Sequence, residues 1–330
     1  MTDAVQQRYA RFSRDEAPGR SALYEEWAAG VAADPEVQRI LLRIPESRRQ
    51  PPLVFAVTRL LGADLGGYPA WRRFVVRNAD EIVAACTARQ LQTNEPLRLA
   101  ALLPVLSEIE GPVAMLEIGA SAGLCLYPDR YSYRFVGEDG ALRAALDPDD
   151  GRSTVTLESR VSGVLPPLRM PEVVWRAGID LAPLHAGDDR DRSWLRALVW
   201  PGESGREERI DAALDIAASD PPRLVAGDAL AEIDALAAEA PAGATLVITT
   251  PGVLVHIPRA ARTALIDRIS GLPARWITID PPGLLDVWEP PVDAGAWPGF
   301  VVALDGRVRA AADPLGRWWE WRAAVAADAS

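Results

Sequence analysis

The chain has 330 residues, 49% of them hydrophobic and 25% charged, and a formal net charge of −11. This is the composition of a globular protein, and the acidic charge disfavours broad binding to nucleic acid, which requires a basic surface. All 35 basic residues are arginine, so mechanisms that need a lysine amine are excluded.

The first third of the chain has helical patterns and no clear strand. Ser21 is a suitable N-cap for one helix, and Asp34 followed by Pro35 marks the start of another. We therefore predict an all-helical domain over residues 1–110. The N-terminal residues lack the apolar segment of a signal peptide, and no apolar run is long enough to span a membrane, so we expect a cytoplasmic protein.

The pattern changes after Gly111. A short apolar run, Val113–Ile118, has the character of a buried parallel strand. Further strand-like runs then alternate with helical patterns: strands at 173–180, 223–228, 245–250 and 275–280, and helices over 191–218, 230–239 and 258–270. This alternation predicts an α/β domain with a mostly parallel, Rossmann-like sheet over residues 111–330.

The end of the chain has a different pattern. Two short apolar runs flank Asp305-Gly306, a dipeptide that favours a tight turn, so we predict an antiparallel hairpin there. Residues 124–172 do not fit the alternation, and we expect an insertion that forms its own hairpin over the edge of the sheet. Three tryptophans are expected to pack at the end of the C-terminal hairpin: Trp318, Trp319 and Trp321.

A glycine-containing turn follows the first predicted strand. In Gly119-Ala120-Ser121-Ala122-Gly123, the small residues let a ligand approach the backbone, with the N–H groups of a following helix facing it. The spacing differs from the Gly-x-Gly-x-x-Gly of dinucleotide sites, so we do not expect a nicotinamide cofactor.

Three acids lie at or near the carboxyl ends of successive predicted strands: Glu117, Asp180 and Asp228. Because ligands of open α/β sheets bind at that edge, we expect the three carboxylates to converge. They could accept the hydroxyls of a ribose, an amine of adenine and an ammonium group, each bond contributing roughly 1.5–3 kcal/mol. Such a set suits a positively charged nucleoside without phosphate, such as S-adenosylmethionine.

Five motifs also carry a family resemblance: Glu117–Leu124, Asp129–Tyr131, Gly178–Leu184, Trp194–Pro201 and Gly227–Ala229. Over nearly the whole chain they resemble an uncharacterised bacterial family that is defined only as a domain of unknown function. That family is similar to class I S-adenosylmethionine-dependent methyltransferases, whose seven-stranded sheet ends in an antiparallel hairpin.

The resemblance implies S-adenosylmethionine as the cofactor. The residues that it assigns to cofactor binding are Glu117, Gly119 and Gly123 in the first motif, Asp180 on the ribose and Asp228 on the adenine side. We also expect Ser121, within the same turn, to contact the cofactor. Two features depart from the methyltransferase pattern. Ser121 stands at the middle of the turn, and the insertion separates Asp180 from the turn by an unusual length of chain. An Asp280-Pro281-Pro282-Gly283 run lacks the aromatic residue of an amine-methylation signature and carries little weight.

Two alternatives remain open. Residues 119–123 also fit Gly-x-Ser-x-Gly, the nucleophile elbow of α/β-hydrolases, and Ser121, Asp228 and His256 follow one another in the triad order of that fold. The chain could also be a scaffold that binds a ligand or partner without catalysis.

The favoured hypothesis is a methyltransferase that acts on a small-molecule acceptor. His256 is the candidate base if the reaction needs one. Two cysteines and two histidines without metal-ligand spacing predict no metal site. We expect no nucleic-acid or membrane partner, and the oligomeric state stays open.

Overall fold

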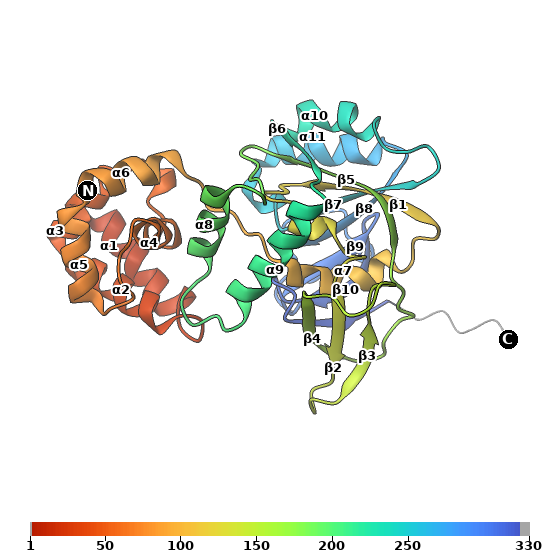
Figure 1. Ribbon diagram of the computed structural model, residues 1–330, viewed down its shortest axis with the longest axis horizontal. Coiled ribbons are helices and arrows are strands. Elements are labelled where there is room, and N and C mark those ends of the chain that lie inside the picture. The colour runs from red at the N-terminus through yellow and green to blue at the C-terminus, as the bar shows by residue number, and fades with distance from the viewer. Residues whose placement is uncertain (1, 324–330) are drawn as a thin grey trace. The chain divides into compact units, whose positions relative to one another are not determined.

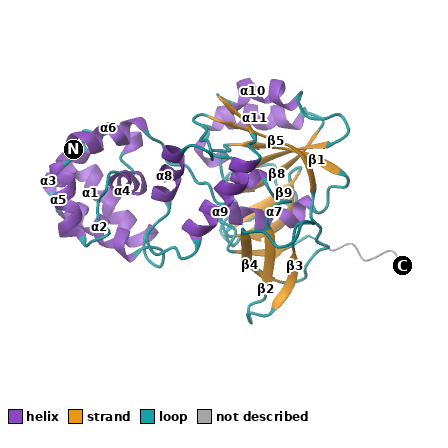
Figure 2. Cartoon of the chain, viewed as in Figure 1, coloured by secondary structure: helices purple, strands orange, loops and turns teal. Residues whose placement is uncertain are grey.

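The computed structural model describes residues 2–323 as an α/β protein with a large mixed sheet (Figures 1 and 2). The chain forms two compact units. The first contains residues 1–93 and 188–211, and the second contains residues 94–187 and 212–330. The predicted boundary near residue 110 therefore differs from the structure, because the first unit ends earlier and takes a second segment from the middle of the chain.

Helices form the regular structure of the first unit. In its first segment these are α1 (Thr2–Arg11), the π-helix η1 (Phe12–Glu16), α2 (Ala22–Ala33), α3 (Pro35–Leu41), the 3₁₀ helix η2 (Glu46–Arg48), α4 (Pro51–Leu60), α5 (Tyr68–Arg77) and α6 (Ala79–Ala88). Its second segment supplies α8 (Asp189–Leu198) and the start of α9 (Arg206–Ser219).

Both predicted helix caps are confirmed. The hydroxyl of Ser21 accepts a hydrogen bond from the backbone of Tyr24 at 3.2 Å, at the start of α2. The carboxylate of Asp34 accepts from the backbones of Glu36 and Val37 at 2.9 and 3.2 Å, at the start of α3. These bonds satisfy N–H groups that have no partner within the helix.

A cluster of buried aromatic side chains forms the core of the first unit: Tyr9, Phe12, Tyr24, Trp27, Phe55 and Trp71. Trp200, from the second segment, belongs to the same cluster. Its ring centre lies 5.2 Å from that of Phe12 and 5.7 Å from that of Tyr24. Arg59 of α4 also donates to the carbonyl of Ala197 at 3.0 Å. The segment 188–211 is therefore part of this core.

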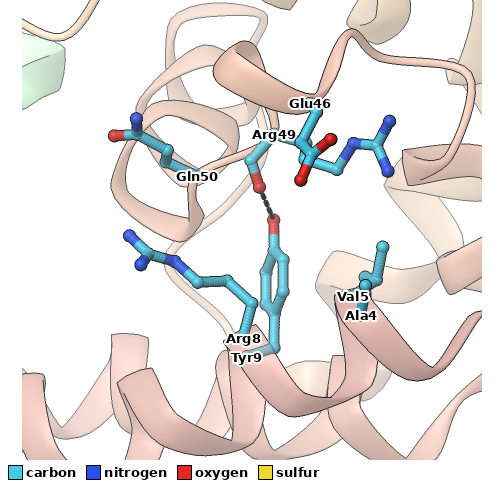
Figure 3. Close-up of a pocket in the computed structure, with 7 residues that line it drawn as sticks. All are labelled: Ala4, Val5, Arg8, Tyr9, Glu46, Arg49 and Gln50. Carbon is cyan, nitrogen blue, oxygen red and sulfur yellow. Dashed lines mark hydrogen bonds between the residues drawn. The ribbon is translucent and has the colours of Figure 1, made fainter.

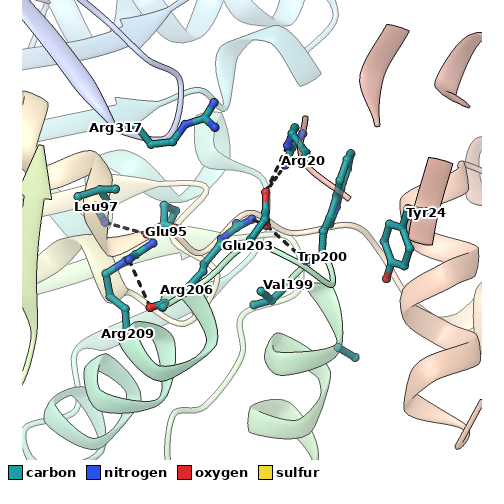
Figure 4. A network of polar contacts seen from close by, with 12 residues as sticks. Arg20, Tyr24, Glu95, Leu97, Val199, Trp200, Glu203, Arg206, Arg209 and Arg317 are labelled. Carbon is teal, nitrogen blue, oxygen red and sulfur yellow. Dashed lines mark hydrogen bonds and ion pairs between the residues drawn. The ribbon is translucent and has the colours of Figure 1, made fainter. Parts of the chain in front are cut away.

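Charged groups hold the loop between α8 and α9 (Figure 4). Glu203 accepts hydrogen bonds from Arg20, at 2.8 Å, and from Arg206. The Arg20 guanidinium also lies 3.6 Å from the ring centre of Trp200, a cation–π contact. We predicted one helix over 191–218, and this was wrong. The chain breaks between α8 and α9, where Pro201 lacks an N–H and Gly202 has a φ of 98°.

A single eleven-stranded sheet dominates the second unit (Figure 2). Its strand order is β3-β2-β4-β11-β10-β9-β8-β7-β1-β5-β6. The strands are β1 (Pro112–Ile118), β2 (Ser132–Val136), β3 (Leu142–Leu146), β4 (Thr156–Ser162), β5 (Glu172–Asp180), β6 (Arg223–Ala226), β7 (Thr245–Pro251), β8 (Ala274–Asp280), β9 (Phe300–Leu304), β10 (Arg307–Ala312) and β11 (Trp318–Trp321).

Five parallel strands around β1 form a doubly wound arrangement. On one side of β1 lie β5 and β6, which follow β2–β4 in the chain. The chain then returns to form β7 and β8 on the other side of β1. The strand order therefore reverses between β1 and β7. Ligands of open α/β sheets bind outside the carboxyl ends of the strands at such a reversal, so a ligand site is expected at this edge.

Helices pack against this sheet. Ile233 of α10 (Ala229–Ala237) and Leu265 of α11 (Arg259–Ser270) share a core with Leu116 and Ile248 of the central strands. The 3₁₀ helix η3 (Pro96–Arg98) leads into the fully buried α7 (Leu99–Leu106), which contacts β4, β8, β9 and β10. Figure 1 shows α10 and α11 side by side on the sheet.

The predicted C-terminal hairpin is confirmed. β9 and β10 pair antiparallel, and Asp305 and Gly306 have φ values of 53° and 79°, as a tight hairpin turn requires. The tryptophan-rich run after it forms a strand, which the sequence pattern did not indicate. β11 pairs antiparallel with β10 and parallel with β4, and Trp319 and Trp321 are buried.

The predicted insertion extends the same sheet. After the 3₁₀ helix η4 (Leu124–Leu126), β2 and β3 form an antiparallel hairpin. β4 then pairs parallel with both β2 and β11. A hairpin was expected and is present, but its strands continue the sheet instead of lying over its edge.

Candidate functional site

The glycine turn joins β1 to η4 through three residues with positive φ: Gly119 at 76°, Ser121 at 52° and Gly123 at 74°. A Cβ atom on Gly119 would lie 2.5 Å from Cγ2 of Val253, in the loop after β7. Glycine is therefore required at 119 both for the backbone conformation and for the close approach of the next strand's loop.

The N–H groups of this turn are largely used within the protein. Those of Gly119 and Ala120 donate to the carbonyl of Ile179 at 2.8 and 3.2 Å, and that of Ser121 donates to the Asp180 carboxylate at 2.9 Å. The element that follows is the three-residue η4 and not an α-helix. The expectation of a helix whose N–H groups face a ligand was therefore wrong. A phosphate would find no cradle of free N–H groups here.

Asp180 lies directly against the glycine turn. Its Oδ2 accepts from Ser121 and its Oδ1 accepts from the backbone of Ala182 at 2.8 Å. Leu184 also donates to the carbonyl of Ser121 at 3.1 Å. The carboxylate is only half-buried, and each of its oxygens has a second lone pair. The structure therefore brings Asp180 and the turn together, with capacity for further hydrogen bonds.

Asp228 lies at the next strand end but is used differently. Its carboxylate caps α10 by accepting from the backbone of Leu230 at 2.9 Å, and the side chain is exposed. The loops that follow β5 and β6 are neighbours, because Gly227 donates to the carbonyl of Asp180 at 3.0 Å. Leu181, in the loop after β5, is 69% exposed, and Leu230, in the first turn of α10, is 40% exposed. The edge thus combines carboxylates with uncovered apolar surface.

His256 is the last residue of η5 (Leu254–His256) and is exposed. Partial desolvation and the nearby Arg98 guanidinium lower the pKa of its imidazole. The buried hydroxyl of Ser121 has no hydrogen-bond partner, and the Asp228 carboxylate caps α10. Across residues 2–323, the hydrogen bonds of a Ser-His-Asp triad are therefore not formed, and the turn is not followed by the helix of a nucleophile elbow.

Several buried polar atoms of the second unit lack hydrogen-bond partners, which is unusual because buried polar groups are nearly always paired. Those at or beside the carboxyl ends of the central strands are Asn94 Nδ2, Glu117 Oε2, Ser121 Oγ, Thr249 Oγ1, Thr278 Oγ1 and both carboxylate oxygens of Asp280. The strand register pairs Glu117 with Thr249, and Thr250 with Thr278. Since side chains alternate along a strand, Glu117 and Thr249 share one face of the sheet, and Thr278 and Asp280 share the other.

The positive charge of Arg98 acts on the carboxyl groups of both Glu117 and Asp280. Arg98 is buried and donates to the carbonyls of Pro251 and Pro314 at 2.8 and 2.9 Å. Burial raises the pKa of Glu117 to about 8, against the opposing charge of Arg98 and with a smaller contribution from Asp180.

Asp280 is also fully buried. Burial raises the pKa of its carboxyl well above the ordinary value, although Arg98 and Arg262 act in the opposite direction. Glu117 and Asp280 are therefore both carboxyl groups that hold a proton more readily than usual.

Sequence reasoning located part of this group. Glu117 and Ser121 were predicted as site residues, whereas Arg98 and the two threonines were missed. A threonine in an otherwise apolar strand is a weak signal, because its branched side chain also favours strands. Asp280 was noted only as part of an Asp-Pro-Pro run. Its position at the end of a predicted strand was a stronger indication than that run that it belongs to this group of polar residues.

Two cavities lie within the first unit. One of about 330 Å³ is lined by α1 and by the residues that precede α4, including Arg8, Tyr9 and Arg49 (Figure 3). The hydroxyl of Tyr9 donates to the carbonyl of Arg49 there. The other, of about 360 Å³, lies against α4 and α8. Neither is lined by a residue predicted to bind the cofactor.

Within residues 2–323 no three histidine, cysteine, aspartate or glutamate side chains are grouped as metal ligands. In the same part of the chain, no helix combines the length and apolar character that a membrane span needs.

The fold and the strand ends define the class: an α/β protein whose mixed sheet has a doubly wound parallel part, with a glycine turn and acids at its carboxyl edge. The chain belongs to the bacterial family described as "Uncharacterized protein conserved in bacteria (DUF2332)", whose model matches residues 6–321. The predicted resemblance to an uncharacterised bacterial family is thereby confirmed, and the likeness of that family to methyltransferases stays a prediction. No curated protein and no solved structure matches the chain.

Proposed function

We propose that the second unit is Rossmann-like and binds S-adenosylmethionine at the carboxyl edge of β1, β5 and β6, as a methyltransferase that acts on a small-molecule acceptor. The observation that carries the proposal is the position of Asp180. Its half-buried carboxylate is anchored by Ser121 and Ala182 beside the glycine turn and keeps lone pairs for the two hydroxyls of a ribose.

The surface beside Asp180 fits a nucleobase. Leu181 offers exposed apolar area in the loop after β5, and Leu230 does so in the first turn of α10, while Asp228 adds an acceptor for an exocyclic amine. Burying a flat apolar ring against such leucines is favourable, while the carboxylates fix its orientation. The edge therefore suits an adenosine group.

The glycine turn supports a ligand without phosphate. Because Gly119, Ala120 and Ser121 donate their N–H groups inside the protein, the turn has little to offer a phosphate. The carboxylates of Asp180 and Asp228 instead favour a ligand with positive charge. A sulfonium nucleoside meets both conditions, whereas a dinucleotide does not.

When bound, S-adenosylmethionine supplies a methyl group that is already activated by its sulfonium. The chain's own residues then need chiefly to align donor and acceptor, an effect that requires no side-chain acid or base. Asp180 and the leucines would hold the donor. His256, whose lowered pKa keeps the imidazole neutral near pH 7, is available to accept a proton from an acceptor.

Calorimetry with S-adenosylhomocysteine tests the proposal. We expect micromolar binding by the full chain, and an affinity about 10–100-fold lower in Asp180→Asn, which keeps a carbonyl acceptor but loses the charge. Leu181→Ala should weaken binding by about 3–10-fold through lost apolar contact. Val164→Ala is the matched control, since Val164 is 67% exposed and follows β4.

Thermal unfolding of each variant separates a binding defect from a folding defect. No binding by a folded wild-type chain would overturn the proposal. Binding that Asp180→Asn and Leu181→Ala leave unchanged would move the ligand away from this edge. Binding without methyl transfer to any acceptor in a small-molecule extract would favour the non-catalytic scaffold.

A further inference from the structure

Glu117 is a buried carboxyl group that lacks a partner. It lies near the end of β1, two residues before Gly119, and is 3% exposed. Its Oε2 is fully shielded from solvent and accepts no hydrogen bond. Such an atom costs folding free energy, and the cost is much larger when the group is charged, unless something in the working protein supplies a partner or a positive charge.

The groups around Glu117 do not supply that partner. Thr249 is its register neighbour on β7, and the Thr249 hydroxyl is itself buried and unpaired. The charged and titratable groups that act on Glu117 are Arg98 of η3, Asp180 of β5 and the Cys125 thiol of η4. Arg98 is the one cation among them, and two of its nitrogens are occupied by backbone carbonyls.

We propose that Glu117 distinguishes the charged methyl donor from the neutral-sulfur product: its carboxyl group is ionised while a sulfonium is bound and protonated otherwise. The inference rests on the proposed function, because it needs the donor at the glycine turn. Direct contact is not required, since charges interact over several ångströms in a poorly solvated site. Glu117 is then a specificity-determining residue.

The physical reason is the cost of burying a charge. Without ligand, burial favours the neutral acid, and it raises the pKa of Glu117 to about 8 despite Arg98. A sulfonium near the turn adds a positive charge that favours the carboxylate. Binding of the donor at pH 7 therefore releases a proton from Glu117 to solvent.

Methyl transfer reverses this state. In that reaction the S–CH₃ bond would break with its electron pair left on sulfur, the methyl group would bond to an electron pair of the acceptor, and the acceptor's proton would go to solvent. The sulfonium would become a neutral thioether, so one positive charge would be lost from the site. Glu117 then takes up a proton from solvent, and the preference for the charged donor over the product follows.

Proton release during binding tests the proposal. The full chain is titrated at pH 7.0 with S-adenosylmethionine and with S-adenosylhomocysteine, each in phosphate and in Tris. These buffers have different heats of ionisation, so the two titrations give the number of protons exchanged. We expect the donor to release between about half and one proton more than the product, because the amino-acid group is common to both ligands.

Glu117→Gln should abolish this difference and reduce the preference for the donor, because the variant has no proton to exchange. Its side chain has the same shape and is neutral, the state that burial favours. Glu172→Gln is the matched control: Glu172 is exposed at the opposite end of β5, and its variant should keep the difference.

Equal proton counts for the two ligands in the wild-type chain overturn the inference even if Glu117→Gln fails to fold. A difference that persists in folded Glu117→Gln overturns it as well. Absence of binding by either ligand is a distinct result, which overturns the proposed function and this inference with it.

Discussion

Single carboxyl groups show what the sequence could predict about the site. That Asp180 meets the glycine turn followed from its place at a strand end, because neighbouring parallel strands end at one edge. Asp228 fitted the same rule, yet its carboxylate caps α10. A cap and a ligand contact use the same residue type in the same place, so sequence alone does not separate them.

Burial of individual groups could not be predicted. The unpaired atoms of Thr249 and Asp280, and the position of Arg98 over the end of β7, depend on packing between segments far apart in the chain. Apolar strand patterns indicate that a side chain points inward, but they do not show whether it finds a hydrogen-bond partner there.

The pH dependence of stability tests the state of Glu117. Its pKa is about 8 in the folded protein and 4.5 in an unfolded chain, so the folded state binds more protons between these values. The stabilisation from this group is complete below pH 4.5 and is lost as the pH rises through 8, by up to about 1.4 kcal/mol per pH unit. Urea unfolding at pH 5 and pH 8 should show this loss in the wild-type chain and a smaller one in Glu117→Gln. Equal losses in the two proteins would show that Glu117 is ionised when folded.

The close approach at Gly119 has its own test. Gly119→Ala adds a Cβ at 2.5 Å from Val253 to a residue with positive φ, whereas Gly111→Ala has the same kind of φ with nothing within 4 Å. The conformational cost, roughly 1–2 kcal/mol, is common to both variants. We expect Gly119→Ala to lose about 1–3 kcal/mol more in denaturant unfolding, because the turn and the loop after β7 must separate. Equal losses would mean that Val253 moves aside freely.

Helices and strands that are marked by local sequence patterns were predicted correctly, whereas the break within a predicted helix was not. The parallel strands and the Asp305-Gly306 hairpin were predicted because apolar runs and turn dipeptides act over a few residues. The break between α8 and α9 was missed although Pro201 and Gly202 stood in the sequence. β11 was missed because its partners are β10 and β4, and strand pairing is not visible within the strand itself.

At the scale of the whole molecule, the segment 188–211 is the feature that sequence patterns could not locate. It lies between β5 and β6, yet Trp200 packs with Phe12 and Tyr24 in the core of the first unit. Contacts across such a separation leave no periodic signal, because each segment reads as an ordinary amphipathic helix or loop.

This division predicts that residues 1–110 alone do not fold cooperatively. The fragment lacks α8 and Trp200 and would expose its aromatic cluster to solvent. Near-ultraviolet circular dichroism and thermal unfolding of the fragment should show no native-like transition. In the full chain, Trp200→Ala should cost about 3–5 kcal/mol. A sharp unfolding transition in the isolated fragment would contradict this role of the segment.

A crystal structure of the full chain with S-adenosylhomocysteine tests the proposed cofactor site most directly. We expect the ribose hydroxyls on the Asp180 carboxylate and the adenine ring against Leu181, beside the glycine turn. A nucleoside bound elsewhere, or a saturating soak that leaves this edge empty, would contradict it.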